Sequence, residues 1–190
     1  MPSMRDKKAL PSDALHSLLL WALENHIEAR PCDESIGELA SPYMQRWHII
    51  RKEKLLDVSF STHLESVKVP FVVENAYVHR FLRSDDDRAL HDHPWPWMSI
   101  LLDGEYLEHR PLQSNGAADQ SQATPRQAGS IAINTDASLA HRIELTTGNP
   151  VTLFLTGYKT REWGFWCGNR WVHWRQFTEL DDSGYSRGCN

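Results

Sequence analysis

The sequence predicts a mainly β protein, a sandwich or closed barrel that follows a helical N-terminal extension. Between residues 43 and 177, short runs rich in aromatic and β-branched residues recur about every 8–12 residues, which is typical of antiparallel β structure. Before that region, one long stretch has the periodicity of an amphipathic helix. With 190 residues, of which 41% are hydrophobic, the chain can bury a sizeable core as one domain.

The N-terminal extension, residues 1–42, is expected to be helical. Residues 11–29 carry an apolar stripe near the helical period, formed by Leu15, Leu18, Leu19, Ala22 and Ile27. Ser12 can cap the start of this helix, and Pro31 ends it. A second, short helical piece is expected over residues 33–39. We expect the helical region to pack against the β body.

The β-barrel domain is expected over residues 43–180. Its strands are expected, in chain order, over residues 43–51, 58–60, 69–73, 76–82, 98–102, 106–110, 130–134, 141–145, 151–158 and near 171–177. Asp103 and Gly104 indicate the turn of a β-hairpin. Residues 111–128 are poor in apolar side chains, which predicts an exposed loop. Residues 181–190 are expected to form a flexible tail.

Composition excludes some classes of partner and predicts a location. The net charge of -5 and the lack of a basic cluster argue against a nucleic-acid-binding surface. No apolar run approaches the length of a membrane span, and the N-terminus lacks the apolar region of a signal peptide. Cys32, Cys167 and Cys189 form no CxxC motif and no paired framework, which is typical of a reducing compartment. We therefore expect a cytoplasmic protein without a nucleic-acid or membrane partner.

Two histidines, His91 and His93, lie one residue apart in the segment LHDHPWPW. In an extended strand both side chains point to the same face, so both imidazoles can bind one metal ion. His141, from a later strand, can join them at the mouth of a small barrel. Three neutral imidazoles leave coordination positions open, as catalytic metal sites require. The alternative is that these are ordinary surface or hydrogen-bonded histidines.

The spacing of these residues resembles that of the cupin family. His91, His93 and Gly104 match the first cupin motif, and Gly129 and His141 match the second. More narrowly, the segments HRFLRSDDDRALHDHPWPW, SILLDGEY, AHRIEL and TGYKTREWGFW resemble small cupin-like proteins of bacteria and prophages. The resemblance implies a single double-stranded β-helix (jelly-roll) barrel and homodimerisation through an edge strand.

The chain departs from the cupin pattern at one ligand position. Trp97 stands where the family has glutamate, and Glu105 lies beyond the expected turn. The implied ligand set is therefore three histidines without a carboxylate, which resembles the iron sites of thiol dioxygenases. One divalent ion is expected, Fe(II) first, with Zn(II), Ni(II), Cu(II) and Mn(II) left open. A neutral ligand set leaves the ion its full charge and favours an anionic or chelating substrate.

Six residues are candidates for the wall of a substrate site, namely Trp97, Ser99, Arg80, His79, Tyr158 and Trp163. Trp97 and Ser99 have the same strand parity as the HxH pair. His79 could be a fourth ligand or could hydrogen-bond to one, and Arg80 could pair with an anionic substrate. The two aromatic residues of the final strand region could narrow the entrance. For each residue, a core or surface role is the alternative.

Other polar residues near the HxH pair have simpler interpretations. The run Asp85, Asp86 and Asp87 is typical of a solvated turn, although one of the three could orient a ligand histidine. Asp92 points to the face opposite the two histidines and is expected to be structural. Cys167 has no base beside it and is expected to be a buried structural cysteine.

The function that these features predict is that of a mononuclear metal-dependent enzyme. A non-haem Fe(II) oxygenase with a three-histidine site and a small organic substrate is the first hypothesis. A hydrolase, lyase or isomerase is an alternative, in which the ion acts as a Lewis acid or generates hydroxide. A non-catalytic small-molecule binder is a further alternative, because a fold does not define a function. The sequence identifies neither the substrate nor individual catalytic residues.

Overall fold

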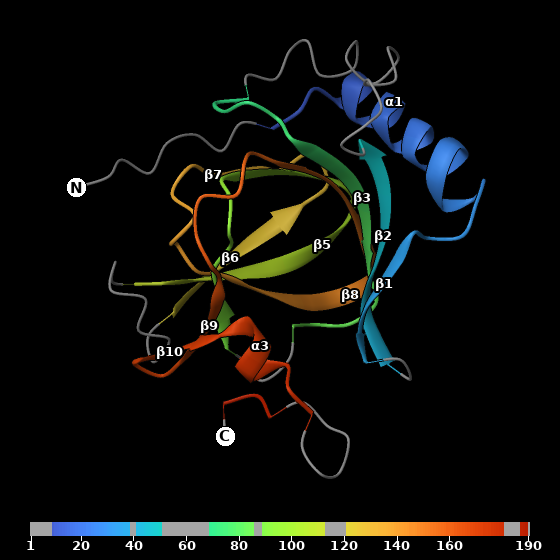
Figure 1. Cartoon of the computed structure of the whole chain (residues 1–190). Helices are drawn as coiled ribbons and strands as arrows, with labels where there is room; N and C mark the ends of the chain where they lie inside the picture. The colour runs from blue at the N-terminus through green and yellow to red at the C-terminus, as the bar shows by residue number, and fades with distance from the viewer. Residues whose placement is uncertain are drawn as a thin grey trace.

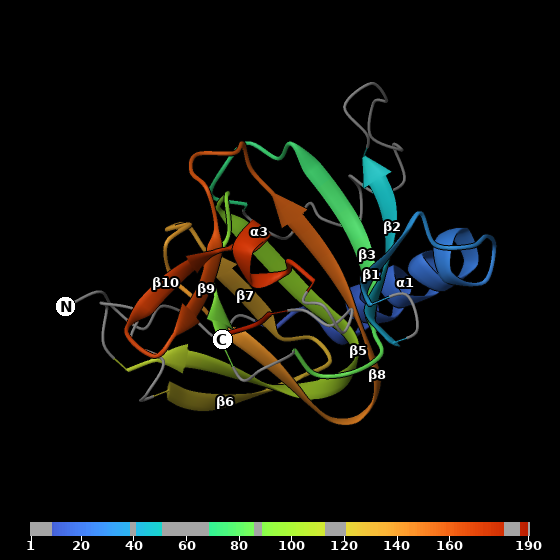
Figure 2. The same cartoon turned by 60° about the horizontal axis from the view of Figure 1, so that its bottom comes forward.

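The computed structural model describes residues 9–38, 41–50, 69–85, 89–112, 121–180 and 187–189. In this part of the chain, two antiparallel sheets follow one N-terminal helix (Figures 1 and 2). This confirms the mainly β fold class and is consistent with a cupin-like sandwich or barrel. No helix within the described ranges is long and apolar enough to cross a membrane.

The larger sheet forms most of the β body. Its strands are β1 (Glu34–Glu38), β2 (Ser41–Ile50), β3 (Asn75–Phe81), β5 (Trp97–Pro111), β6 (Ser121–Gln127), β7 (Ile131–Asn134) and β8 (Arg142–Thr156). They have the order β1-β2-β3-β8-β5-β6, and β7 pairs with β5. Both β3 and β5 pair with β8, so sequence-distant strands are adjacent at the centre of the sheet.

The smaller sheet lies at the end of the molecule away from the N-terminal helix (Figures 1 and 2). It contains β4 (Leu90–His91), β9 (Gly164–Cys167) and β10 (Arg170–His173), in the order β10-β9-β4. The short helix α3 (Trp174–Phe177) follows β10. The expected strand near residues 171–177 is therefore half strand and half helix.

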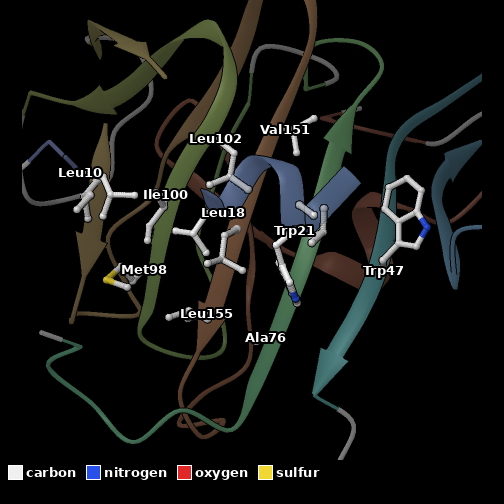
Figure 3. Packing of buried hydrophobic residues seen from close by; sticks show 14 residues of the cluster. Leu10, Leu18, Trp21, Trp47, Ala76, Met98, Ile100, Leu102, Val151 and Leu155 are labelled. Carbon is white, nitrogen blue, oxygen red and sulfur yellow. The ribbon is translucent and has the colours of Figure 1, made fainter. Parts of the chain in front are cut away.

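The N-terminal helix packs on the outer face of the larger sheet. It comprises α1 (Ser12–Ala22) and a π-helical continuation, η1 (Leu23–Ile27), within the predicted range 11–29. Leu18 and Trp21 are buried against the strands, in one cluster with Met98 and Leu155 (Figure 3). Burying such side chains contributes about 1.5–3 kcal/mol each. The predicted cap by Ser12 is wrong, because Pro11 occupies the N-cap position and no side chain caps the helix.

Two further predictions for this part of the chain are wrong. The expected helix over residues 33–39 is instead strand β1, which pairs with β2 and includes Gly37 at φ +110°, a conformation that an α-helix excludes. The expected strand over residues 69–73 does not form, although Val69, Phe71 and Val73 still pack against the core. The alternation of apolar residues over 69–73 therefore indicated burial correctly but did not indicate a strand. The expected strand at 58–60 lies outside the described residues.

Strand β5 replaces the predicted hairpin. Asp103 and Gly104 do not form a turn, because β5 continues through them and pairs with β8 on both sides. The register shifts at Leu101, Asp103 and Glu105 are β-bulges. Gly104 has φ +79°, and a Cβ atom there would lie 3.1 Å from the Cα atom of Pro150. An Asp-Gly pair allows positive φ in a bulge as well as in a turn, and this ambiguity explains the error.

Strand boundaries elsewhere also differ from the prediction. The strands expected over 141–145 and 151–158 form the single strand β8. Residues 121–127, expected in an exposed loop, form β6, which pairs with the second half of β5 while its side chains stay largely exposed. An edge strand with one solvated face resembles a loop in composition, which is why the sequence did not distinguish them.

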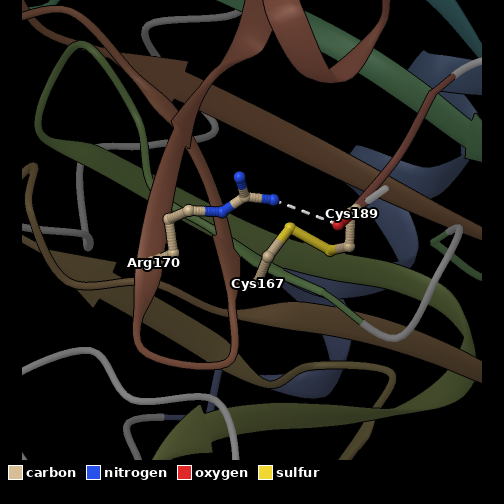
Figure 4. Close-up of a disulfide and its surroundings, with 3 residues drawn as sticks. All are labelled: Cys167, Arg170 and Cys189. Atoms are coloured by element: carbon tan, nitrogen blue, oxygen red, sulfur yellow. Dashed lines mark hydrogen bonds between the residues drawn. A yellow bond between two sulfur atoms is a disulfide. The ribbon is translucent and has the colours of Figure 1, made fainter.

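A disulfide joins Cys167, at the end of β9, to Cys189 (Figure 4). The Cα atoms are 5.3 Å apart, and Arg170 Nη2 donates to the Cys189 carbonyl over 3.1 Å. The disulfide corrects the expectation that no cysteines are paired. The argument for a reducing compartment, which depended on unpaired cysteines, is therefore lost. Near this disulfide, Gly188 N also donates to Phe177 O over 3.0 Å. Cys32 is free and half-buried.

Candidate metal centre

Three histidines from two segments of the chain converge inside the β body. His91 ends β4 and His141 immediately precedes β8, and their backbones exchange two hydrogen bonds of 2.8 and 2.9 Å. His93 N donates to the Ala137 carbonyl over 3.1 Å, which attaches His93 to the segment that leads into His141. One ring nitrogen of each histidine lies within 4.8 Å of the other two, and His93 Nε2 is 2.9 Å from His141 Nε2. The structure therefore brings the predicted metal ligands together.

Burial keeps the HxH pair neutral. The pKa of His91 and the pKa of His93 both lie well below 6.5, first because burial disfavours the charged ring and then because His141 is close. At neutral pH these two rings therefore hold lone pairs. A neutral imidazole is the form that binds a metal ion.

Glu108, on β5, contacts His141 at the ring nitrogen that does not face His93. Its side chain is buried, and Oε1 lies 3.0 Å from Nδ1 of His141. Arg110 Nε donates to Oε1 over 2.9 Å, and Arg126 Nε donates to Oε2 over 2.9 Å. Burial raises the pKa of the Glu108 carboxyl, but the His141 hydrogen bond and the two arginines outweigh it and hold this pKa far below its usual range.

An ionised Glu108 defines the tautomer of His141. A carboxylate only accepts hydrogen bonds, so Nδ1 of His141 carries the proton and Nε2 presents its lone pair to the other two histidines. The sequence reasoning missed this residue because the expected hairpin turn separated it from the site. The available signal was the pair Glu108 and Arg110, two opposite charges with the same strand parity.

Trp97 is the one substrate-wall candidate in direct contact with the cluster. Its ring stacks on His141 with centroids 4.7 Å apart, and it meets His93 edge-on at 5.6 Å. Phe154 stacks on Trp97 at 5.6 Å, and the Arg110 guanidinium lies 5.8 Å from the Trp97 ring centre. The indole N–H is buried and has no hydrogen-bond partner among the described residues. Where cupins have a ligand carboxylate, this chain has an aromatic wall.

His79 lies near the cluster but behind an aromatic ring. It stacks on Phe154 with ring centroids 5.2 Å apart, and the Phe154 ring in turn lies beside His93, with centroids 6.1 Å apart. Its Nε2 accepts from Arg46 Nε over 3.0 Å, and burial holds the pKa of His79 well below 6.5. His79 is thus engaged with Arg46 and is not a member of the three-histidine group.

The remaining wall candidates are not brought together. Ser99 is buried directly across from Phe154 in the β5–β8 pairing, so it lies on the inner face. Arg80 follows His79 on β3 and therefore points to the opposite face of the sheet. Tyr158 is 59% exposed. Trp163 stacks on Trp174, with centroids 5.8 Å apart, and also contacts Phe165, whose ring in turn contacts His91.

One aspartate of the 85–87 run lies beside the site. Asp85 Oδ2 is 3.7 Å from Nδ1 of His91, and it accepts a hydrogen bond of 2.6 Å from Ile143 N. The carboxylate is too far from the ring for a direct hydrogen bond but close enough to favour a proton on that nitrogen. Residues 86 and 87 lie outside the described part of the chain.

Comparison with known proteins gives no family. No family model and no curated protein matches the chain. Among solved structures, it is similar to hydroxypropylphosphonic acid epoxidase from S. wedmorenis in complex with fosfomycin (14% identity, 43% of this chain and 42% of that chain, TM-score 0.35). It is also similar to Fe(II) HppE in complex with substrate (13%, 68% and 57%, TM-score 0.44) and to Fe(II)-HppE with the alternative substrate (S)-1-HPP (12%, 70% and 60%, TM-score 0.42). The chain spans less than two thirds of each of these proteins.

Proposed function

We propose that His91, His93 and His141 bind one divalent metal ion and that the protein is a mononuclear metal-dependent enzyme. In its specific form, the proposal is a non-haem Fe(II) oxygenase that acts on a small organic substrate. The observation that supports metal binding is the convergence of three imidazole nitrogens within 4.8 Å of one another. The preference for Fe(II) rests on the resemblance of the ligand set to three-histidine iron sites.

The dimensions of the cluster fit a single ion. Metal–imidazole bonds are about 2.0–2.1 Å long, so two nitrogens on one ion lie at most about 4.2 Å apart. The His93–His141 nitrogen pair, at 2.9 Å, is within this limit. The nitrogen of His91 lies within 4.8 Å of the nitrogens of His93 and His141. This upper distance exceeds the limit of about 4.2 Å by about 0.6 Å, and a small rotation of one ring removes the difference.

The protein groups around the cluster have separable tasks. Glu108 keeps the proton of His141 on Nδ1, away from the metal-binding nitrogen. Trp97 and Phe154 exclude water from one side and supply a flat apolar wall. The buried indole N–H of Trp97 is a donor that an oxygen or nitrogen atom of a bound substrate could satisfy. An Fe(II) ion held by three neutral ligands would supply open positions for a chelating or anionic substrate and for the activation of O2.

Metal analysis of protein purified with and without oxygen tests the proposal. We expect about one iron per chain in anaerobically purified wild type and its loss in His91→Ala and His141→Ala. His109→Ala is the matched control, because His109 is on β5 but pairs with Glu144 outside the cluster. Substrate-dependent O2 uptake, screened with small organic anions, is expected of wild type and of His109→Ala but not of the two variants that lack a metal ligand. Tightly held zinc without O2 uptake would instead support a hydrolase, lyase or isomerase.

A different outcome would overturn metal-dependent catalysis altogether. Wild type that binds no divalent metal, together with a His91→Ala variant of unchanged stability and ligand binding, leaves only a non-catalytic small-molecule binder. The cytoplasmic location, the homodimer and the division into residues 1–42, 43–180 and 181–190 stay predictions. Size-exclusion chromatography with light scattering measures the oligomeric state.

A further inference from the structure

Asp92 is a fully buried carboxylate between the two histidines of the HxH pair. Each of its oxygens has a donor. Gly164 N donates to Oδ1 over 2.8 Å, and Trp171 Nε1 donates to Oδ2 over 2.9 Å. Arg161 Nη1 forms an ion pair of 2.7 Å with the same Oδ2. The Asp92 backbone N also donates to the Gly164 carbonyl over 3.0 Å, so side chain and backbone are bound to one residue.

The partner of this carboxylate is the hairpin formed by β9 and β10. Gly164 begins β9, and Trp171 is on β10, two positions from its end. The hairpin is closely packed at this point, because a Cβ atom on Gly164 would lie 2.2 Å from the Val172 carbonyl oxygen. Asp92 is therefore held by a hairpin that is closely packed at the point of contact.

The position of Asp92 links this hairpin to the histidines. In the extended segment 91–93, the Asp92 side chain points toward the hairpin while the side chains of His91 and His93 point to the opposite face. A rotation of this backbone that moves the two imidazoles also breaks the contacts of the carboxylate. Hydrogen bonds to a charged group are stronger than those between neutral groups, so the three together resist such a rotation.

We propose that Asp92 is a positioning residue of the metal centre, whose attachment to the β9–β10 hairpin holds His91 and His93 at binding distance from His141. This inference rests on the proposed metal site. It assigns Asp92 a role beyond fold stability, because the same contacts that bury it define where two of the three ligands lie. It also makes the hairpin part of the support of the site.

Cobalt(II) titration of wild type and Asp92→Asn tests this role, with the Co(II) absorption spectrum as a second readout. Asparagine has the same shape, but its NH2 group must face one of the donors that the carboxylate accepts from. We expect the affinity for Co(II) to fall about 10-fold to 100-fold, the range for losing a residue that supports a metal ligand, and the spectrum to change. Glu162→Gln is the matched control, because this exposed carboxylate lies beside Arg161 but contacts only Lys159 and His173. It is expected to match wild type.

Two milder variants keep the carboxylate and remove one donor each. Trp171→Phe deletes the indole N–H, and Arg161→Met deletes the ion pair. Both are expected to weaken Co(II) binding less than Asp92→Asn, at a temperature where circular dichroism shows every apo variant to be folded. If Asp92→Asn does not fold, these two variants decide, and wild-type affinity and spectrum in both would overturn the positioning role.

The outcomes separate the two proposals. Wild type that does not bind Co(II) overturns the metal site itself. Wild type that binds Co(II), with an Asp92→Asn variant of equal affinity and identical spectrum, overturns only the positioning role. A folded Asp92→Asn variant with weakened binding and an altered spectrum supports both, because a purely structural role would lower the melting temperature without changing the ligand field.

Discussion

Replacing Glu108 with glutamine keeps the size of the side chain but removes the charge that three neighbours share. In the wild type, Oε1 accepts from His141 and Arg110, and Oε2 accepts from Arg126. An arginine has no acceptor, so the new NH2 group meets a donor on either side. Among these neighbours only His141 can change from donor to acceptor, by moving its proton from Nδ1 to Nε2. The substitution is thus expected to convert the metal-binding nitrogen into an N–H group.

The structure sets the size of two effects. Removing one partner of a buried charge network costs about 3–5 kcal/mol, and the lower end applies because the Arg110 side chain is 35% exposed and remains partly hydrated. The loss of the orienting partner of a ligand histidine lowers metal affinity about 10-fold to 100-fold. Urea unfolding of the apo protein measures the first effect. Chelator competition with Zn(II) measures the second.

The control is Glu105→Gln on the same strand. Glu105 is exposed and accepts only from the hydroxyl groups of Thr146 and Thr147, at 3.4 Å. We expect it to change unfolding free energy by less than about 0.5 kcal/mol and leave metal affinity unchanged. Nitrogen NMR of the imidazoles reports the tautomer directly. The reasoning is refuted if Glu108→Gln retains wild-type affinity with the His141 proton still on Nδ1.

Further predictions concern pH, backbone conformation and the disulfide. Because the folded-state pKa of His79 is lowered, the unfolded chain binds the extra proton, so this contribution to stability is complete above pH 6.5 and is lost as pH falls below it. Apo His79→Gln should therefore show a pH dependence of unfolding free energy between pH 6.5 and 5 that is shallower by up to about 1.4 kcal/mol per unit. Gly104→Ala should destabilise by about 1–3 kcal/mol in urea unfolding, and by more than Gly148→Ala, which also has positive φ but nothing within 4 Å of the new Cβ. Reduction of the disulfide, whose cysteines are 22 positions apart, should cost about 3 kcal/mol by thermal unfolding, whereas Cys32→Ser should not mimic it.

The sequence predicted the parts of the fold that depend on local pattern. The helix over 12–27 formed where the apolar stripe indicated, and β3 formed within one residue of its predicted bounds. Strand parity, a local property, predicted that His91 and His93 share a face, whereas His141, 48 positions beyond His93, was predicted from its place in the second cupin-like motif. The wrong predictions concern features that depend on pairing between distant segments. β1 depends on β2, and the disulfide depends on the return of the chain to β9, and neither dependence is visible in a short window.

The candidate site was predicted as a set of ligands but not as a network. The resemblance to cupins directed attention to the glutamate position, which holds Trp97, and the ligand set was expected without a carboxylate. The three-residue group that could hold an ion consists of His91, His93 and His141, and the ligand set itself stays a prediction. A buried carboxylate is nevertheless present next to this group, because Glu108 is hydrogen-bonded to His141. It could not be found from spacing, because its place depends on how β5 bends against β8.

The bulged strand β5 also constrains how the length of this chain can change. Trp97 and Glu108 both contact His141 from one strand, although 11 residues of straight strand would separate them by about 36 Å. Leu101 and Tyr106, on either side of the bulges, pack in the same cluster although one is odd-numbered and the other even-numbered. The bulges therefore invert the in-and-out alternation. A deletion of one residue there would turn Glu108 outward while leaving each of the three histidines in place, so an insertion or deletion of a single residue in this strand is equivalent to a mutation of the site.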